Sequence, residues 1–557
     1  MGHNPFMTSW LRVVTIYGVL VLAGGLLFHA WLDMPSGRGL PAHFPGLVAL
    51  QGMSLLLGGW LIRSAHRTDS DESVPFRWKS LWVIGVLLLL LLLGFASGLS
   101  GMTLMGAGLA TLHGSLELLG FVLGRIKRGG AALLLLLLLV PICLGALALH
   151  SPRALKDAAE PLTGLDALFT AVSAVTVTGL SVVDVGSRLS SEGQWILLLL
   201  IQLGGLGAVS LFLLFMSFIG EGLGLRQGKA VREAMDNFNL KEMKSLVGTI
   251  FFWTLVFETL GILLLAFSRV DQGLRWSPAF EHLFHSVSAF CNSGFSLYSD
   301  SLASMDRMDV AVLCLLIMAG GLGFPVFLNL WSRLTGQTRR LETHVYLSFG
   351  TSLMLWIGGA ALLWIGSEGI QSLFWSVTAR TAGFSIASVT TLGDFSLLVL
   401  IILMLIGASP GSTAGGLKTS TLGVLFVSLY QQVLGRKQVH FMNRTLSATL
   451  LRSAMVLTVL YLSAWILLMA CLHLTERESL ESGVLTQQDL VFETASALGT
   501  VGLSLDATSQ ISPAGLWVIM AGMVLGRIGP LAIIVILASL KRSSSVAERP
   551  DARVMLG

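Results

Sequence analysis

Long apolar segments, separated by short polar or glycine-containing stretches, follow one another along almost the whole chain. The first four cover about 12–32, 45–62, 80–98 and 102–124. Eight more follow in pairs, at about 131–149 and 193–219, 246–268 and 309–332, 344–366 and 396–431, and 447–473 and 513–540. Apolar runs of about 18 or more residues are long enough to cross a bilayer as helices. The pattern therefore predicts an all-α integral membrane protein.

Each of the last four pairs encloses a short polar loop that contains the tripeptide Gly-[Leu/Phe]-Ser. The four loop glycines are Gly179, Gly294, Gly383 and Gly502. A phenylalanine precedes each of them, by nine positions at Gly383 and by ten positions at the other three. A further glycine comes 24 to 26 positions after each of them, at Gly204, Gly320, Gly407 and Gly526. Repetition at a nearly constant spacing indicates repeated structural units. The core is therefore predicted to be four copies of an outer helix (M1), a short pore helix, a glycine loop and an inner helix (M2).

These repeats divide the chain into six predicted parts. Extra N-terminal transmembrane helices occupy 1–129, and a polar cytoplasmic tail occupies the end of the chain. The four repeats occupy 130–220, 221–333, 334–432 and 433–540, and the tail occupies 541–557. The composition excludes a chain made of several soluble domains, because 54% of the residues are hydrophobic and only 12% are charged, with a mean hydropathy of +0.80.

The glycine loops predict a pore for cations. Non-helical backbone at membrane depth is tolerated only where it is buried in protein or lines a polar path. Four such loops around one axis would direct their carbonyls inward and replace the hydration shell of a monovalent cation. Glycine adopts backbone angles that other residues avoid, and the C-terminal ends of the pore helices also favour cations. The alternative, four turns that only pack helices, gives no reason for the same tripeptide to recur.

Basic residues predict the orientation. With the N-terminus inside, clusters such as Arg125–Arg128 and Arg436–Lys437 fall on the inner side, and the outer loops are richer in acids. Because Lys and Arg concentrate on the cytoplasmic side, we expect the glycine loops to face outward and both termini to be cytoplasmic. Three acids follow loop glycines by four to six positions and are predicted to attract cations, although solvated loops also explain them: Asp184, Asp300 and Asp506.

The loops TVTGLS, CNSGFS, RTAGFS and TVGLS, with their helices, resemble the Trk/Ktr/HKT superfamily of potassium transporters. The resemblance covers about 130–540 and implies that each loop supplies one quarter of a single potassium filter through its backbone carbonyls. A glycine in all four quarters is similar to the potassium-selective members, whereas members with serine in the first quarter tend to pass sodium. The implied ligands are Thr176, Val177, Thr178, Gly179, Cys291, Asn292, Ser293, Gly294, Arg380, Thr381, Ala382, Gly383, Thr500, Val501 and Gly502.

The resemblance also implies partners and a location. It implies a homodimer in the lipid of the cell inner membrane, with a cytoplasmic RCK-type regulatory subunit that binds a nucleotide. It implies no cofactor in this chain, potassium as the substrate and no enzymatic activity. The family's bacterial members usually have no extra N-terminal helices or two, whereas this sequence predicts four. The net charge of +4 is modest, and no nucleic-acid partner is predicted.

The M2 segment of the third repeat contains helix-breaking residues. Proline and glycines in 407–420 do not continue a lipid-facing helix. Leu417 separates Gly416 from Lys418, so the Gly-Lys-[Ser/Thr] of a phosphate-binding loop is absent. By resemblance this is a flexible gate beneath the filter, and the alternative is a passive kink. The gate residues are Gly407, Ser409, Pro410, Gly411, Ser412, Thr413, Gly415, Gly416 and Lys418.

Arg527 stands where the first two repeats keep a second glycine, at Gly205 and Gly321. Charged residues at membrane depth usually face an interior path. We therefore expect Arg527 to lie beside the pore, as part of the gate, and to act as an electrostatic barrier. The alternative is a structural partner for a buried acid such as Glu258.

Two other classes of protein are weaker interpretations. Gly98–Gly101 matches a Gly-x-Ser-Gly pattern of intramembrane serine proteases, but a nucleophile needs a base, and His113 lies on the next helix in sequence. A tight turn is the favoured explanation there. Alternating-access carriers show inverted or paired repeats, whereas these four repeats share one orientation. The four cysteines have no paired spacing, so neither a disulfide framework nor a metal site is indicated.

Overall fold

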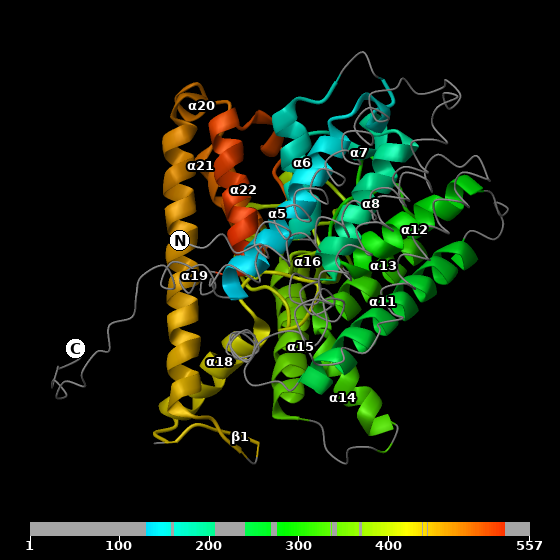
Figure 1. Cartoon of the computed structure of the whole chain (residues 1–557). Helices are drawn as coiled ribbons and strands as arrows, with labels where there is room; N and C mark the ends of the chain where they lie inside the picture. The colour runs from blue at the N-terminus through cyan, green and yellow to red at the C-terminus, as the bar shows by residue number, and fades with distance from the viewer. Residues whose placement is uncertain are drawn as a thin grey trace, which may run out of the picture.

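The computed structural model describes residues 130–529, except 158–160, 207–239, 269–275, 335, 337–341, 367–369, 437 and 443. The four N-terminal apolar segments, the Gly98–Gly101 motif and the tail 541–557 lie outside the described residues. The described part is mostly helical (Figure 1).

The four M1 segments are helices α5 (Gly130–Leu149), α11 (Leu240–Ser268), α15 (Thr343–Leu363) and α19 (Ala448–Thr475). The last three contain stretches that are long and apolar enough to cross a membrane, at 250–268, 343–363 and 448–475. Large apolar side chains are exposed on their surfaces, including Leu255, Phe267 and Leu467 at 66%, 79% and 65%. Such side chains are favourable against lipid and costly against water, so these helices are suited to the lipid boundary.

The four pore segments are shorter helices: α6 (Gly164–Thr176), α12 (Trp276–Phe290), α16 (Ile370–Thr378) and α21 (Gln487–Gly499). At about 1.5 Å per residue they are too short to cross a hydrocarbon core of about 30 Å. Their starts are set locally; for example, Thr486 and Asp489 form a capping box on α21. The phenylalanine before each loop glycine is buried and anchors its helix in the core: Phe169, Phe284, Phe374 and Phe492.

The M2 segments are less regular than the sequence suggests. Repeats one and four have single described helices, α8 (Ser191–Gly205) and α22 (Pro513–Ile528). The third M2 is interrupted between α17 (Asp394–Leu405) and α18 (Thr419–Val433).

The prediction of one continuous M2 helix at 309–332 in the second repeat is wrong. The helix breaks into α13 (Arg307–Leu322) and α14 (Phe324–Leu334), which meet at 89°. Gly323 adopts a φ of +84°, and the Phe324 amide donates to the Gly411 carbonyl at 3.0 Å. Pro325 follows and has no amide hydrogen to donate. The chain bends because Gly323 permits it and because the 407–420 loop replaces a helical hydrogen-bond partner.

Short elements complete the two ends of the molecule. The helices α7 (Val185–Arg188) and α20 (Arg477–Glu481) lie at the end where the pore helices begin, and the β-hairpin and α14 lie at the opposite end (Figure 1). The hairpin pairs β1 (His440–Phe441) with β2 (Arg444–Thr445), a small departure from the all-α prediction. Within the described ranges, 3-10 helices occupy Pro152–Ala154, Val389–Thr391 and Thr508–Gln510.

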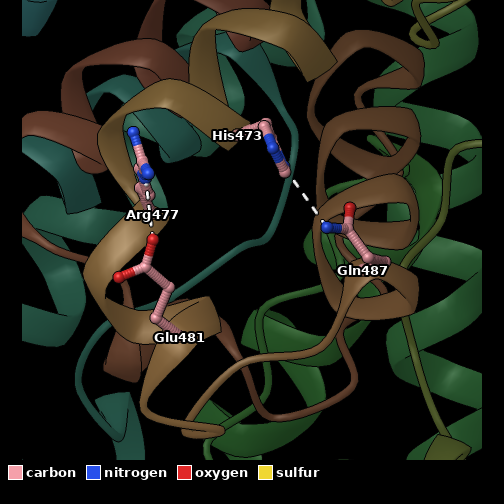
Figure 2. Close-up of polar contacts among 4 residues, drawn as sticks. All are labelled: His473, Arg477, Glu481 and Gln487. Atoms are coloured by element: carbon pink, nitrogen blue, oxygen red, sulfur yellow. Dashed lines mark hydrogen bonds and ion pairs between the residues drawn. The ribbon is translucent and has the colours of Figure 1, made fainter.

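Polar contacts secure the turn from α19 through α20 to α21 (Figure 2). Arg477 and Glu481 form an exposed ion pair at 2.8 Å along α20, and Gln487 Nε2 on α21 lies 3.4 Å from His473 Nδ1 on α19. Exposed pairs of this kind contribute little stability, so they serve mainly to order the turn ahead of the fourth pore helix.

Candidate ion pathway

All four glycine loops share a strained backbone conformation. The residue two positions before each loop glycine has a positive φ: 57° at Val177, 59° at Asn292, 77° at Thr381 and 51° at Thr500. The glycines follow with φ of 89°, 74°, 77° and 96°. Positive φ is a genuine outlier for β-branched residues such as Val177 and Thr381, and it costs about 1–3 kcal/mol each. Strain repeated in all four loops points to a functional constraint.

The loop glycines touch one another's chains in a closed ring. A Cβ atom on Gly179 would overlap the Ser293 carbonyl oxygen of the second loop, and one on Gly294 would lie 2.7 Å from the Ala382 carbonyl oxygen of the third. In the same way Gly383 faces the Val501 carbonyl, and Gly502 faces the Thr178 carbonyl of the first loop. The contacts run from loop one to two, three, four and back to one. Every loop thus presents backbone to its neighbour, and only glycine leaves room for it.

Hydroxyl groups from the last turns of the pore helices hold these loops. Ser173 and Ser496 accept the amide hydrogens of Gly179 and Gly502, each at 3.0 Å. Ser288 and Thr378 donate to the carbonyls of Phe295 and Phe384, each at 2.7 Å. This set was not predicted from the sequence, although a hydroxylated residue five or six positions before every loop glycine was a signal for it.

Two ionisable residues also support the outer part of the ring and were missed. His285 follows Phe284 on α12, and its Nε2 lies 3.0 Å from the hydroxyl of Ser296. Glu493 follows Phe492 on α21 and accepts hydrogen bonds from Ser504 and, at 2.9 Å, from Thr508. Both side chains are buried. They hold the Gly-[Leu/Phe]-Ser serines of the second and fourth loops, which are opposite quarters in the order of the ring.

The glycines of M2 allow these helices to approach the ring closely. A Cβ on Gly204, Gly320 or Gly526 would overlap a carbonyl oxygen in the last turn of the pore helix of the same repeat. The three carbonyls belong to Val175, Phe290 and Leu498. The constant spacing seen in the sequence is thus a packing requirement.

The loop 407–420 bonds to the second repeat and packs against the fourth glycine loop. The Ser409 amide donates to the Gly321 carbonyl at 3.1 Å, and the Thr413 hydroxyl donates to the Phe290 carbonyl at 3.2 Å. A Cβ on Gly415 would overlap the side chain of Thr500 in the fourth loop. Lys418 Nζ donates to the Ala414 carbonyl at 2.7 Å and so closes the loop on itself. The segment is therefore packed directly against the cytoplasm-facing side predicted for the ring.

Arg527 links this loop to a distant helix. Its guanidinium donates to the carbonyl oxygens of Thr413 in the loop and Gly204 in α8. Glu258, the alternative partner, lies near a different group: its carboxylate is 3.9 Å from the Cys291 sulfur. The contacts of Arg527 are thus with the loop and the first M2 helix.

Comparisons with known proteins identify the family of the chain. The model of a family described as "TrkH: Cation transport protein" matches residues 145–357 and 362–548. The chain belongs to the TrkH family of cation transport proteins. The family resemblance inferred from the four loops is thereby confirmed, and so is the expectation that the chain is a transporter and not an enzyme. As a TrkH-family protein with several apolar helices, it is a multi-pass membrane protein.

Curated relatives and a solved structure extend the comparison. The chain is 32% identical to "Ktr system potassium uptake protein B" of Bacillus subtilis over 75% of this chain and 94% of that protein. It is 31% identical to "Potassium/sodium uptake protein NtpJ" of Enterococcus hirae, over 71% and 90%. The crystal structure of the potassium transporter TrkH from Vibrio parahaemolyticus matches with a TM-score of 0.58 at 16% identity, covering 88% of this chain and 96% of that one. At that identity the structural match speaks for the fold alone.

Proposed function

We propose that the chain carries potassium ions across the membrane through one pore whose filter is the ring of four glycine loops. The observation that supports this most is the closed ring itself, in which strained backbone from four repeats meets around one point. Such strain persists only where the surroundings enforce it, and it clusters at ligand-binding sites. Carbonyl rings are the arrangement that replaces the hydration shell of potassium in channels. The relatives named as potassium uptake proteins support the choice of ion.

The electrostatics of the pore helices favour the same ion class. The helices α6, α12, α16 and α21 all end directly before their loops. Each C-terminus carries a partial negative charge, and four of them near one point attract a cation. The hydroxyls of Ser293, Thr381 and Thr500 are buried without a hydrogen-bond partner among the described residues. Buried polar atoms normally have a partner, so these hydroxyls suit a path that holds water or an ion.

The loop 407–420 is the proposed gate. In the proposal it lies across the path beneath the ring. Hydrogen bonds from Arg527 and to Gly320 and Gly321 hold it in place. Those bonds can be broken without unfolding a helix, because the segment between Leu405 and Thr419 is not helical. Opening is then a movement of this loop away from the axis.

The proposed orientation rests on the distribution of basic residues, and the proposed assembly on the family resemblance. The proposal places the ring toward the outside of the inner membrane and the hairpin at 440–445 in the cytoplasm, with both termini cytoplasmic. It also includes a homodimer and a nucleotide-binding RCK-type regulatory subunit on the cytoplasmic face. These two partners rest on the family resemblance. The basic inner loops could contact the regulatory subunit, but the positive-inside rule explains them equally well.

Uptake measurements test the proposed function. A cell that lacks its own potassium uptake systems should grow at low potassium and accumulate the ion when it expresses this chain. Uptake should saturate with potassium, and repeating the assay with and without sodium distinguishes potassium transport from joint potassium and sodium uptake. Expression at normal levels in the membrane without any cation uptake, alone or with a regulatory subunit, would contradict the proposal.

A further inference from the structure

Arg380 begins the third glycine loop and differs from its counterparts. The equivalent positions in the other loops, three residues before the glycine, carry the smaller Thr176, Cys291 and Gly499. The Arg380 side chain is only 3% exposed. The family resemblance implies a role for its backbone carbonyl alone, so the long charged side chain needs a separate explanation.

The guanidinium extends from the ring to two other elements. Nη1 donates to the Ser352 carbonyl on α15 at 3.1 Å, and Nη2 lies 3.3 Å from both the Ser352 hydroxyl and the Gly407 carbonyl. The Trp356 ring lies beneath it, with the guanidinium carbon 5.3 Å from the ring centroid. Gly407 is the first residue of the proposed gate, two positions after α17 ends at Leu405. One side chain thus joins the filter loop, an outer helix and the start of the gate.

Local electrostatics explain why a cation stands here without an acid. Among the described residues, the contacts of Arg380 are carbonyl oxygens, a hydroxyl and an aromatic face, with no carboxylate. The last four carbonyls of a helix lack helical partners, and a C-terminus attracts positive charge. The helix α17 ends at Leu405, two residues before Gly407, whereas α8, α13 and α22 continue past the equivalent Gly204, Gly320 and Gly526. The position of Arg380 therefore matches the repeat whose M2 helix stops before its spaced glycine and leaves the Gly407 carbonyl outside the helix.

We propose that Arg380 is a positioning residue that couples the third quarter of the filter to the gate. While its fork holds Gly407, the first residue of the gate stays fixed to the filter loop, and the closed arrangement is favoured. When the gate moves, this bond is lost, and the filter quarter loses one of its supports. Arg527 holds the middle of the same loop at Thr413, so the two arginines restrain different points. This inference rests on the proposed gate function of 407–420.

The test compares Arg380→Met in two backgrounds, the parent and a deletion of 411–415. Methionine keeps an apolar side chain over Trp356 but donates no hydrogen bonds. A hydrogen bond to a charged group contributes enough to shift an open–closed equilibrium about tenfold. We therefore expect Arg380→Met to raise rubidium uptake per folded protein about tenfold in the parent and not at all in the deletion. Potassium-over-sodium discrimination should fall in both backgrounds. Arg153→Met, which removes another buried arginine, is the matched control and should change neither quantity.

The outcomes separate the two proposals. If the deletion raises flux but Arg380→Met raises it equally in both backgrounds, the coupling is refuted while the gate stands. If the deletion is folded and no faster than the parent, the gate itself fails, and the coupling with it. Should Arg380→Met not fold, Arg380→Lys decides: one ammonium group replaces two nitrogens and cannot keep the Nη1 bond to the Ser352 carbonyl together with both Nη2 bonds, so flux should rise partially. Parental flux and selectivity in Arg380→Lys would overturn the inference.

Discussion

The ring contact between the first two glycine loops makes Gly179→Ser a direct test of the filter. Gly179 has a φ of +89°, and a Cβ there would lie 3.1 Å from Gly294 Cα and would overlap the Ser293 carbonyl oxygen. The left-handed conformation alone costs about 1–2 kcal/mol for a residue with a Cβ. To restore an ordinary 3.4 Å contact, the second loop must retreat by 3.4 − 3.1, or about 0.3 Å, at its Cα and further at its carbonyl. The substitution therefore displaces a proposed ligand of the neighbouring quarter.

The expected result is a loss of selectivity larger than the loss of stability. Since 1.4 kcal/mol corresponds to a factor of ten, a displaced carbonyl that loses about this much preference for potassium lowers the potassium-to-sodium ratio about tenfold. Reversal potentials, or competition of each ion against rubidium uptake, measure that ratio in membranes with matched amounts of protein.

Gly483→Ser is the matched control for this experiment. Gly483 also has a positive φ, +75°, but nothing lies within 4 Å of its Cβ position. The control therefore carries the same backbone penalty without touching a loop. If Gly179→Ser kept the parental ion ratio at normal expression, or changed it no more than Gly483→Ser does, the first loop would not be a filter quarter.

Three further predictions concern the gate and the outer mouth. Deleting 411–415 should raise flux severalfold and lessen dependence on a regulator in uptake assays, and a folded deletion with parental flux would indicate a passive break. Arg527→Ala should raise maximal potassium flux and leave selectivity largely intact, because it frees Thr413 from α22. Slower flux in well-folded protein would contradict this. The alternative pairing with Glu258 predicts instead that Arg527→Ala lowers the yield of folded protein and that adding Glu258→Gln partly restores it. At Asp184, burial raises the pKa, but hydrogen bonds, including those from Ser299, Ser187 and the Gly186 amide, outweigh it and hold the pKa below its ordinary 3.8. Because the folded-state pKa is lowered, this carboxylate contributes stability that is present above pH 3.8 and is lost as the pH falls through the folded-state pKa. The thermal midpoint of unfolding should therefore fall less between about pH 5 and about pH 3 in Asp184→Asn than in the parent. An equal fall in both proteins would refute the assignment.

The sequence alone predicted the features that depend on local pattern. Hydrophobic runs indicated the helices because a bilayer requires apolar segments of a minimum length, and the M1 helices fall close to the expected bounds. The repeated tripeptide indicated the family because its four copies agree in order and spacing. Pro410 and its neighbouring glycines marked the interruption of the third M2, since these residues act on their own backbone. Gly323 and Pro325 carried the same kind of signal, and it was overlooked.

The partners of individual side chains were decided only by the tertiary structure. Arg527 meets Gly204 across 323 positions of sequence and Thr413 across 114, and no periodicity encodes such distances. Whether Arg380 points to the ring or away from it depends on where α17 ends in space and on the carbonyl that this end leaves free. The order in which the four loops touch has the same origin, since each glycine is matched to a carbonyl of another repeat. A linear pattern specifies which residues are small, charged or apolar, but contacts between repeats are settled when all the helices pack together, because burial and hydrogen bonding must be satisfied simultaneously.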